Sequence, residues 1–139
     1  MRISFYAADV PLPRFTKKKT TAWIEKVARR YKTSFREVNY VFCSDSYLLG
    51  INRQFLNHNT LTDIITFRLS EKGEPIEAEI YISTERVAEN ALRFKSTLDN
   101  ELHRVIIHGI LHLAGFKDKK APEKALMRKT EEACLSLRK

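Results

Sequence analysis

The segment from Leu98 to Ala114 is the feature that most constrains the fold of this 139-residue chain. It is the most apolar helical pattern in the sequence, and apolar side chains point in nearly every direction around its axis. A helix of that kind is buried inside a domain, so the other elements must be arranged around it. Thr97 is placed to cap its first turn, and Gly115 is placed to end it.

The other patterns predict strands and helices that are intermixed along the chain. The predicted strands are Ile3–Tyr6, Val38–Cys43, Ile64–Leu69 and Ala78–Ile82. Further helices are predicted around Trp23–Tyr31, Leu48–Leu56, Thr84–Phe94 and Pro122–Leu137. The first strand, helix and strand favour a parallel pair, and the turn EKGEP favours an antiparallel hairpin. We expect one α+β domain, with a mixed sheet of about four strands packed with about five helices.

The charge balance points to a polyanion as partner. The formal net charge is +8, and lysines near phosphates release condensed counterions on binding. The most basic stretches are Lys17–Lys19 and the group Lys117, Lys119 and Lys120. Such lysines could be merely solvated and favour solubility, but we place nucleic acid ahead of that alternative.

The sequence shows no apolar stretch near the ~20 residues of a membrane span, and its start lacks the pattern of a signal peptide. We therefore expect a cytoplasmic protein without a membrane partner. Cys43 and Cys134 lie in separate apolar patterns, and we interpret both as reduced core residues.

Three of the four histidines lie in the apolar segment, and their spacing separates them. His112 lies about 40° around the helix from His108 and one turn along, so both imidazoles can approach one ion. His103 points about 140° away and is expected to be packed or solvated. Gly115 lets the chain reverse, so that Asp118 can bring a carboxylate to the same ion. Two imidazoles, one carboxylate and an open position are typical of a catalytic zinc site, which binds and acidifies a water.

Each of these residues also has a structural interpretation. Histidines at this spacing are common in cores, and Asp118 could be a turn or cap residue before Pro122. Glu101 lies about 20° from His108 around the helix and could support it, but we interpret Glu101 as the acid of the first helical turn. A small zinc metalloprotease shares the two-histidine helix. Residue 109, however, is glycine where such proteases carry a glutamate base.

Two segments resemble those of a known family. HGILHLAGFKD, from His108 to Asp118, resembles the signature HGxLHLxGYDH of the YbeY family, metal-dependent endoribonucleases that act in ribosomal RNA maturation. INRQFLNHNTLTDIITF, from Ile51 to Phe67, resembles the family's LNxxYRxxDxPTDVLSF. The residues kept in this second block are Asn52, Thr62, Asp63 and Phe67. AEIYIS also resembles the family's GDIxIS, and ALMRKTEEACL resembles its C-terminal helix.

The resemblance implies one metal-dependent endoribonuclease domain over residues 1–139. His108, His112 and Asp118 would hold one zinc ion or another divalent metal, with Asp118 in place of the family's third histidine. A carboxylate also ligates zinc, although it shifts the preference towards harder ions. No side chain is assigned as catalytic, because the metal's own water is the expected reactive group.

The resemblance also implies RNA as partner, in particular ribosomal RNA and the ribosome, in maturation and quality control. We expect a preference for single strands and no DNA specificity. Leu56 stands where the family has an arginine thought to contact RNA, so another residue must supply that charge. His58 is the first candidate, followed by Arg53, Arg68 and Lys117. A ribosome-associated RNA-binding protein with a structural metal is the alternative function.

Overall fold

The computed structural model describes residues 1–58 and 61–138, which form a four-stranded sheet and five helices. The strands are β1 (Arg2–Ala7), β2 (Phe35–Cys43), β3 (Ile64–Arg68) and β4 (Ile76–Ser83). The helices are α1 (Lys17–Arg30), α2 (Asp45–Leu56), α3 (Thr84–Arg93), α4 (Leu98–Leu113) and α5 (Ala121–Leu135). The predicted α+β class, with a mixed sheet, is confirmed.

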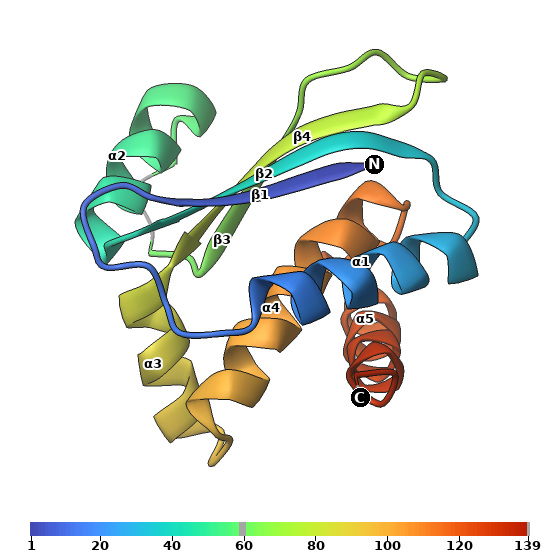
Figure 1. Ribbon diagram of the computed structural model, residues 1–139. Coiled ribbons are helices and arrows are strands. Elements are labelled where there is room, and N and C mark those ends of the chain that lie inside the picture. Colours follow the sequence, from blue (N-terminus) through green and yellow to red (C-terminus); the bar gives the residue numbers. More distant parts are fainter. Residues whose placement is uncertain (59–60, 139) are drawn as a thin grey trace.

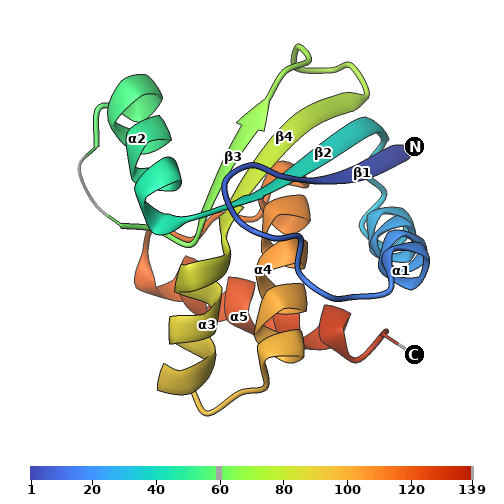
Figure 2. The same cartoon turned by 60° about the vertical axis from the view of Figure 1, so that its left-hand side comes forward.

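The sheet has the strand order β1-β2-β4-β3 (Figure 2). β1 pairs in parallel with β2, and β2 in parallel with β4, whereas β3 is antiparallel to β4 at one edge. The predicted parallel pair and the predicted hairpin are therefore both confirmed. Gly73 in the hairpin turn has a φ of 93°, a conformation that favours glycine. The guanidinium of Arg68 donates to the carbonyl oxygens of Glu71 and Glu74, which closes the turn.

One face of the sheet packs on helices α1, α4 and α5, with α3 beside α4 (Figure 1). Alternate residues of the strands point to this face, among them Tyr40 of β2 and Ile80 of β4, and both are fully buried. The hydroxyl of Tyr40 donates to the carbonyl oxygen of Ile106 at 2.9 Å, which joins β2 to α4. The apolar helix predicted at the centre of the domain is thus its core element.

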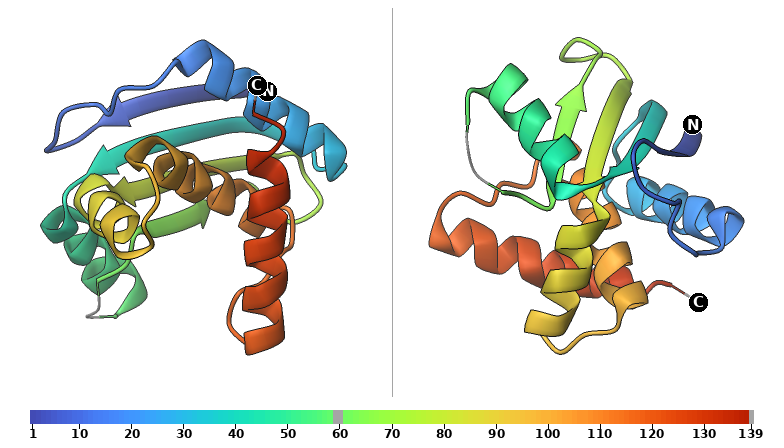
Figure 3. Two further views of the ribbon diagram at one scale, coloured as in Figure 1. Left: turned by 90° about the horizontal axis from the view of Figure 1, so that it is seen from below. Right: turned by 90° about the vertical axis from the view of Figure 1, so that its left-hand side faces the viewer.

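α2 packs on the opposite face of the sheet and forms a second, smaller core (Figure 3). Its buried members are Cys43, Leu48 and Ile65. Ser44 caps α2, because its hydroxyl accepts a hydrogen bond from the backbone N–H of Tyr47 at 3.1 Å. α2 begins at the end of the sheet where β3 also starts, because Cys43 of β2 pairs with Ser83 and Ile64 of β3 pairs with Ile82.

Gly109 allows α4 to lie close to the sheet. A Cβ atom at this position would meet Cδ1 of Ile80 at 2.8 Å and Cδ1 of Ile64 at 3.2 Å, which is closer than ordinary packing permits. The glycine that distinguishes this helix from that of the metalloproteases therefore has a packing role.

Several element boundaries differ from the prediction, and two of the differences have a clear cause in the backbone hydrogen bonds. β2 begins at Phe35 rather than Val38, because Phe35 pairs with the first residue of β4 across a bulge. α5 ends at Leu135 rather than Leu137, because the N–H groups of Leu137 and Arg138 bond three residues back instead of four.

Cys43 and Cys134 are free and buried, as predicted. Within the described ranges, every helix is too short or too polar to cross a membrane.

Candidate active site

His108 and Asp118 meet at the C-terminal end of α4. Thr97 caps the start of the helix by accepting from the N–H of Asn100 at 3.0 Å, and Gly115 follows its end with a φ of 110°. This left-handed turn folds the connection back along the helix. As a result, Oδ2 of Asp118 lies 3.3 Å from Nε2 of His108. Figure 3 shows the connection between α4 and α5 on the side where α2 and the start of β3 lie.

The other nitrogen of His108 is held by a buried carboxylate of α5. Nδ1 of His108 lies 2.6 Å from Oε2 of Glu131, and Glu131 is almost completely buried. Since a carboxylate at neutral pH only accepts, Nδ1 donates this hydrogen bond. The contact fixes the orientation of the ring and leaves Nε2 facing Asp118.

Arg104 links Glu131 to a second buried carboxylate. Its guanidinium donates to Oε1 of Glu131 at 2.9 Å and to both carboxylate oxygens of Glu101. The same guanidinium lies 4.0 Å from Oδ2 of Asp63, at the start of β3. The predicted first-turn acid, Glu101, is therefore part of a buried network that reaches His108 through Arg104 and Glu131.

The network changes the protonation of its members. Burial alone would lower the pKa of His108, but the hydrogen bond and charge of Glu131, together with Asp63 and Asp118, raise it above its usual value. Burial would raise the pKa of Glu131, yet His108 and Arg104 hold it below its ordinary value. Burial does raise the pKa of Asp63, against the opposing charges of His108 and Arg104. The site thus concentrates carboxylates around one imidazole.

His112 is exposed one turn beyond His108. The described residues include no group of three His, Cys, Asp or Glu side chains arranged to hold a metal ion. The structure therefore brings His108 and Asp118 together and leaves His112 beside them as a separate donor. Two imidazoles and one carboxylate are side chains of the kinds that ligate divalent metal ions. A carboxylate on the far nitrogen of a ligating histidine is also the usual support in metal sites.

The sequence patterns did not reveal Arg104, Glu131 or Asp63 as members of this site. Arg104 precedes His108 by one helical turn, so its place on the same flank of α4 was available from the spacing. Asp63 lies in the second block that resembles the family. Glu131 offered no local signal, because only the packing of α5 on α4 brings it to His108.

His58, the first candidate for the missing RNA-contacting charge, lies exposed just beyond α2, near the half-exposed Leu56. Its backbone N–H donates to the carbonyl oxygen of Asn52 at 3.1 Å. Arg53 and Lys117 are also exposed. Residues 59 and 60, which follow His58 in the sequence, lie outside the described residues.

Comparison with known proteins identifies the family. The family model described as "Endoribonuclease YbeY" matches residues 4–138. A protein named endoribonuclease YbeY from Cytophaga hutchinsonii is 48% identical over 99% of this chain and 96% of its own length. One from Phocaeicola vulgatus, with the same name, is 46% identical over 97% of each chain. A solution structure of a Thermotoga maritima protein superposes with a TM-score of 0.62 at 30% identity, covering 97% of this chain and 87% of its own. The chain described here belongs to the YbeY endoribonuclease family.

Proposed function

We propose that this chain is a zinc-dependent endoribonuclease that cleaves single-stranded RNA in the maturation and quality control of ribosomal RNA. It would act in the cytoplasm as a single domain, with the ribosome as a partner. His108, His112 and Asp118 would hold the metal. The observation that carries the proposal is that the two ring nitrogens of His108 have different partners. Nδ1 is bound by Glu131, and Nε2 faces Asp118.

The buried network supports this proposal because it holds one imidazole in a fixed position. Glu131 is bound from one side by Arg104 and from the other by His108, so it cannot rotate without breaking two charged hydrogen bonds. A ligand that is fixed in this way loses little conformational freedom when it binds an ion. Zinc, when bound, would supply a Lewis acid to the scissile phosphodiester.

The surroundings of the site also fit a phosphodiester as substrate. The carboxylates of Glu101, Glu131 and Asp63 are held by Arg104 and His108. Lys117, one residue before Asp118, is exposed and can contact a phosphate, and His58 is also exposed. A net charge of +8 favours binding of a polyanion in general, and this binding should weaken steeply with salt.

The test is zinc affinity by chelator competition, combined with cleavage of a single-stranded RNA. His112→Ala and Asp118→Ala should each lower zinc affinity about tenfold or more, and cleavage should fall with it. Asp118→His should retain zinc, because an imidazole replaces the carboxylate with the donor type of the family's signature. His58→Ala is the matched control for the metal, since His58 is exposed outside α4, and it should bind zinc normally.

Two results would contradict the proposal. If Asp118→Ala binds zinc as tightly as the unmodified chain, Asp118 is a turn residue and not a ligand. If zinc binds as expected but the loaded protein cleaves no RNA, the metal is structural and the chain is an RNA-binding protein. Weaker RNA binding by His58→Ala, with zinc unchanged, would assign the phosphate contact to His58.

A further inference from the structure

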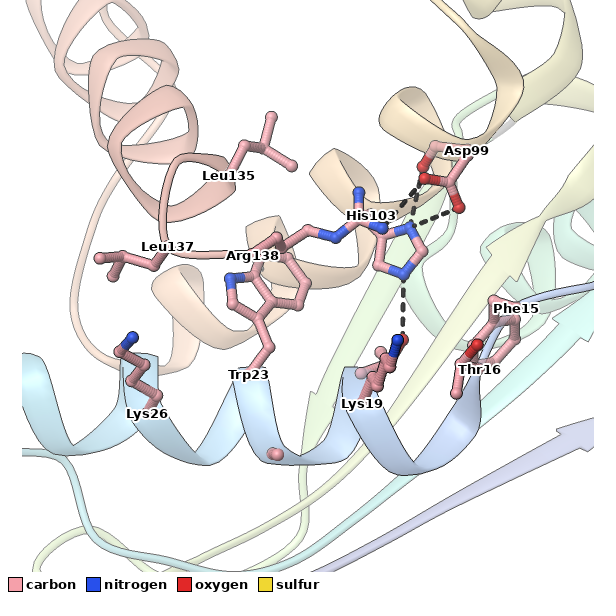
Figure 4. A pocket seen from close by; sticks show the side chains of 12 residues that line it. Phe15, Thr16, Lys19, Trp23, Lys26, Asp99, His103, Leu135, Leu137 and Arg138 are labelled. Atoms are coloured by element: carbon pink, nitrogen blue, oxygen red, sulfur yellow. Dashed lines mark hydrogen bonds and ion pairs between the residues drawn. The ribbon is translucent and has the colours of Figure 1, made fainter.

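A polar cavity lies between α1, the start of α4 and the chain that follows α5 (Figure 4). Its volume is about 690 Å³, within the range of cavities that hold small organic ligands. The His103 flank of α4 forms one wall, and His103 points about 140° away from His108 around the helix. The cavity is therefore separate from the candidate active site.

The cavity is lined by three cations and one carboxylate. Lys19 and Lys26 are two helical turns apart on α1, so both side chains lie on the same flank of that helix. Arg138 donates to Asp99 at 2.9 Å, which neutralises the carboxylate. Neither lysine has an ion-pair partner among the described residues. Two positive charges without an ion-pair partner in the described part of the chain thus line the cavity, where they favour an anion.

The interior of the cavity offers flat and apolar surfaces. The guanidinium of Arg138 lies over the ring of Trp23, 5.7 Å from its centre, and Phe15 and Leu137 form further walls. The polar groups underneath are already paired, because His103 is hydrogen-bonded to both Thr20 and Asp99 (Figure 4). A ligand here would place a charged group on the lysines and a planar or apolar group against the arginine and the rings.

We propose that this cavity binds a nucleoside phosphate, with the phosphate on Lys19 and Lys26 and the base against Arg138 and Phe15. The choice of a nucleoside phosphate among organic phosphates rests on the proposed ribonuclease function. The ligand is either a free nucleotide or one nucleotide of an RNA strand bound at a distance from the active site.

Trp23 makes the proposal directly measurable, because it is the only tryptophan of the chain and it lines the cavity. Fluorescence of the full-length protein is titrated with uridine 5′-monophosphate, with uridine, with inorganic phosphate and with a short oligouridylate. The variant Lys19→Gln/Lys26→Gln removes both charges. The matched control Lys72→Gln/Lys129→Gln removes two charges from exposed lysines outside the cavity.

We expect the nucleotide or the oligouridylate to change the fluorescence of Trp23. Its affinity should fall roughly tenfold to a hundredfold in Lys19→Gln/Lys26→Gln and stay within about twofold in the control. Binding of the free nucleotide indicates a nucleotide site, and binding of the oligouridylate alone indicates a contact with an RNA strand; both support the proposal. Thermal melting of each variant confirms that its fold is intact.

Three results would overturn the proposal. One is no fluorescence change with any nucleotide, and another is equal affinity in the two double variants. The third is phosphate binding as tightly as the nucleotide, which would exclude a contact with the nucleoside. His108→Ala should leave the fluorescence titration unchanged, so a failure of RNA cleavage is distinguishable from a failure of this site.

Discussion

His103 and His108 lie five residues apart on α4, and they differ in burial, in hydrogen-bond partners and in the direction in which their pKa is shifted. His103 is 2% exposed and is bonded to the hydroxyl of Thr20 and the carbonyl oxygen of Asp99. Burial lowers its pKa, even though Asp99 lies close by. His108 is partly exposed. Burial would lower its pKa, but Glu131 and the neighbouring carboxylates raise the pKa above its usual value.

Burial alone does not separate a packed histidine from a functional one. Both imidazoles are desolvated, and burial is the largest single influence on the pKa of each. The difference is the number of carboxylates whose charge is directed at the ring. A carboxylate network costs desolvation energy and is weak evidence for stability, so its presence around His108 points to chemistry rather than packing.

The largest expected effect comes from removing the carboxylate that supports His108. Glu131→Ala leaves His108 without its buried partner and leaves Arg104 with Glu101 as its remaining buried carboxylate, and we expect the free energy of unfolding to fall by about 3–5 kcal/mol. Glu132→Ala is the matched control, because its exposed side chain forms only a 3.8 Å ion pair with Arg128. The control should lose less than about 1 kcal/mol. Urea unfolding measures both, and similar losses would show that the network is not stabilising.

A smaller loss in the free energy of unfolding is expected from a substitution at Gly109, on the side of α4 that faces the sheet. Gly109→Ala would place a Cβ 2.8 Å from Ile80, so we expect a loss of about 1–3 kcal/mol in the free energy of unfolding. Gly50→Ala in α2 meets no atom within 4 Å and should gain about 0.5–1 kcal/mol, because alanine favours a helix. Thermal melting measures both. A gain in both variants would mean that Ile80 moves aside without cost.

The smallest expected effect is the contribution of His103 to the pH dependence of the free energy of unfolding. The folded chain binds a proton at His103 only below its usual pKa of 6.5, whereas the unfolded chain binds it at that value. Stability from His103 is therefore complete above pH 6.5 and is lost as the pH falls below it. Between pH 6.5 and 5.5 the loss should be no more than about 1 kcal/mol.

His103→Gln isolates this contribution, since the other histidines titrate equally in both proteins. The variant is expected to be less stable at pH 7.5 and to show a shallower decline towards pH 5.5, as measured by urea unfolding. An identical decline in both proteins would mean that the pKa of His103 is not lowered in the folded chain.

Local patterns were sufficient for most of the fold. Alternation placed Tyr40 in a core-facing strand, and Thr97 and Gly115 marked the ends of α4, because these signals depend on neighbouring residues. The approach of Asp118 to His108 followed from the turn at Gly115 for the same reason.

The partners of the two histidines depend on tertiary packing and were not predictable in this way. Thr20 is 83 residues from His103, and Glu131 is 23 residues from His108 on another helix. No spacing rule connects such positions, since only the docking of α1 and α5 on α4 brings them together. For the same reason, the contacts of Glu131 with Arg104 and His108 could not be predicted from the sequence.

The hydrogen bond between His108 and Glu131 can form only late in synthesis, because Glu131 lies on the last helix. A nascent chain leaves the ribosome from its N-terminus, so α4 is made before the carboxylate that orients His108. Until α5 emerges and docks, the imidazole has no partner on Nδ1 and Arg104 lacks one of its two carboxylates. The site of this ribonuclease family member is therefore completed only after α5 has been synthesised and has docked on α4.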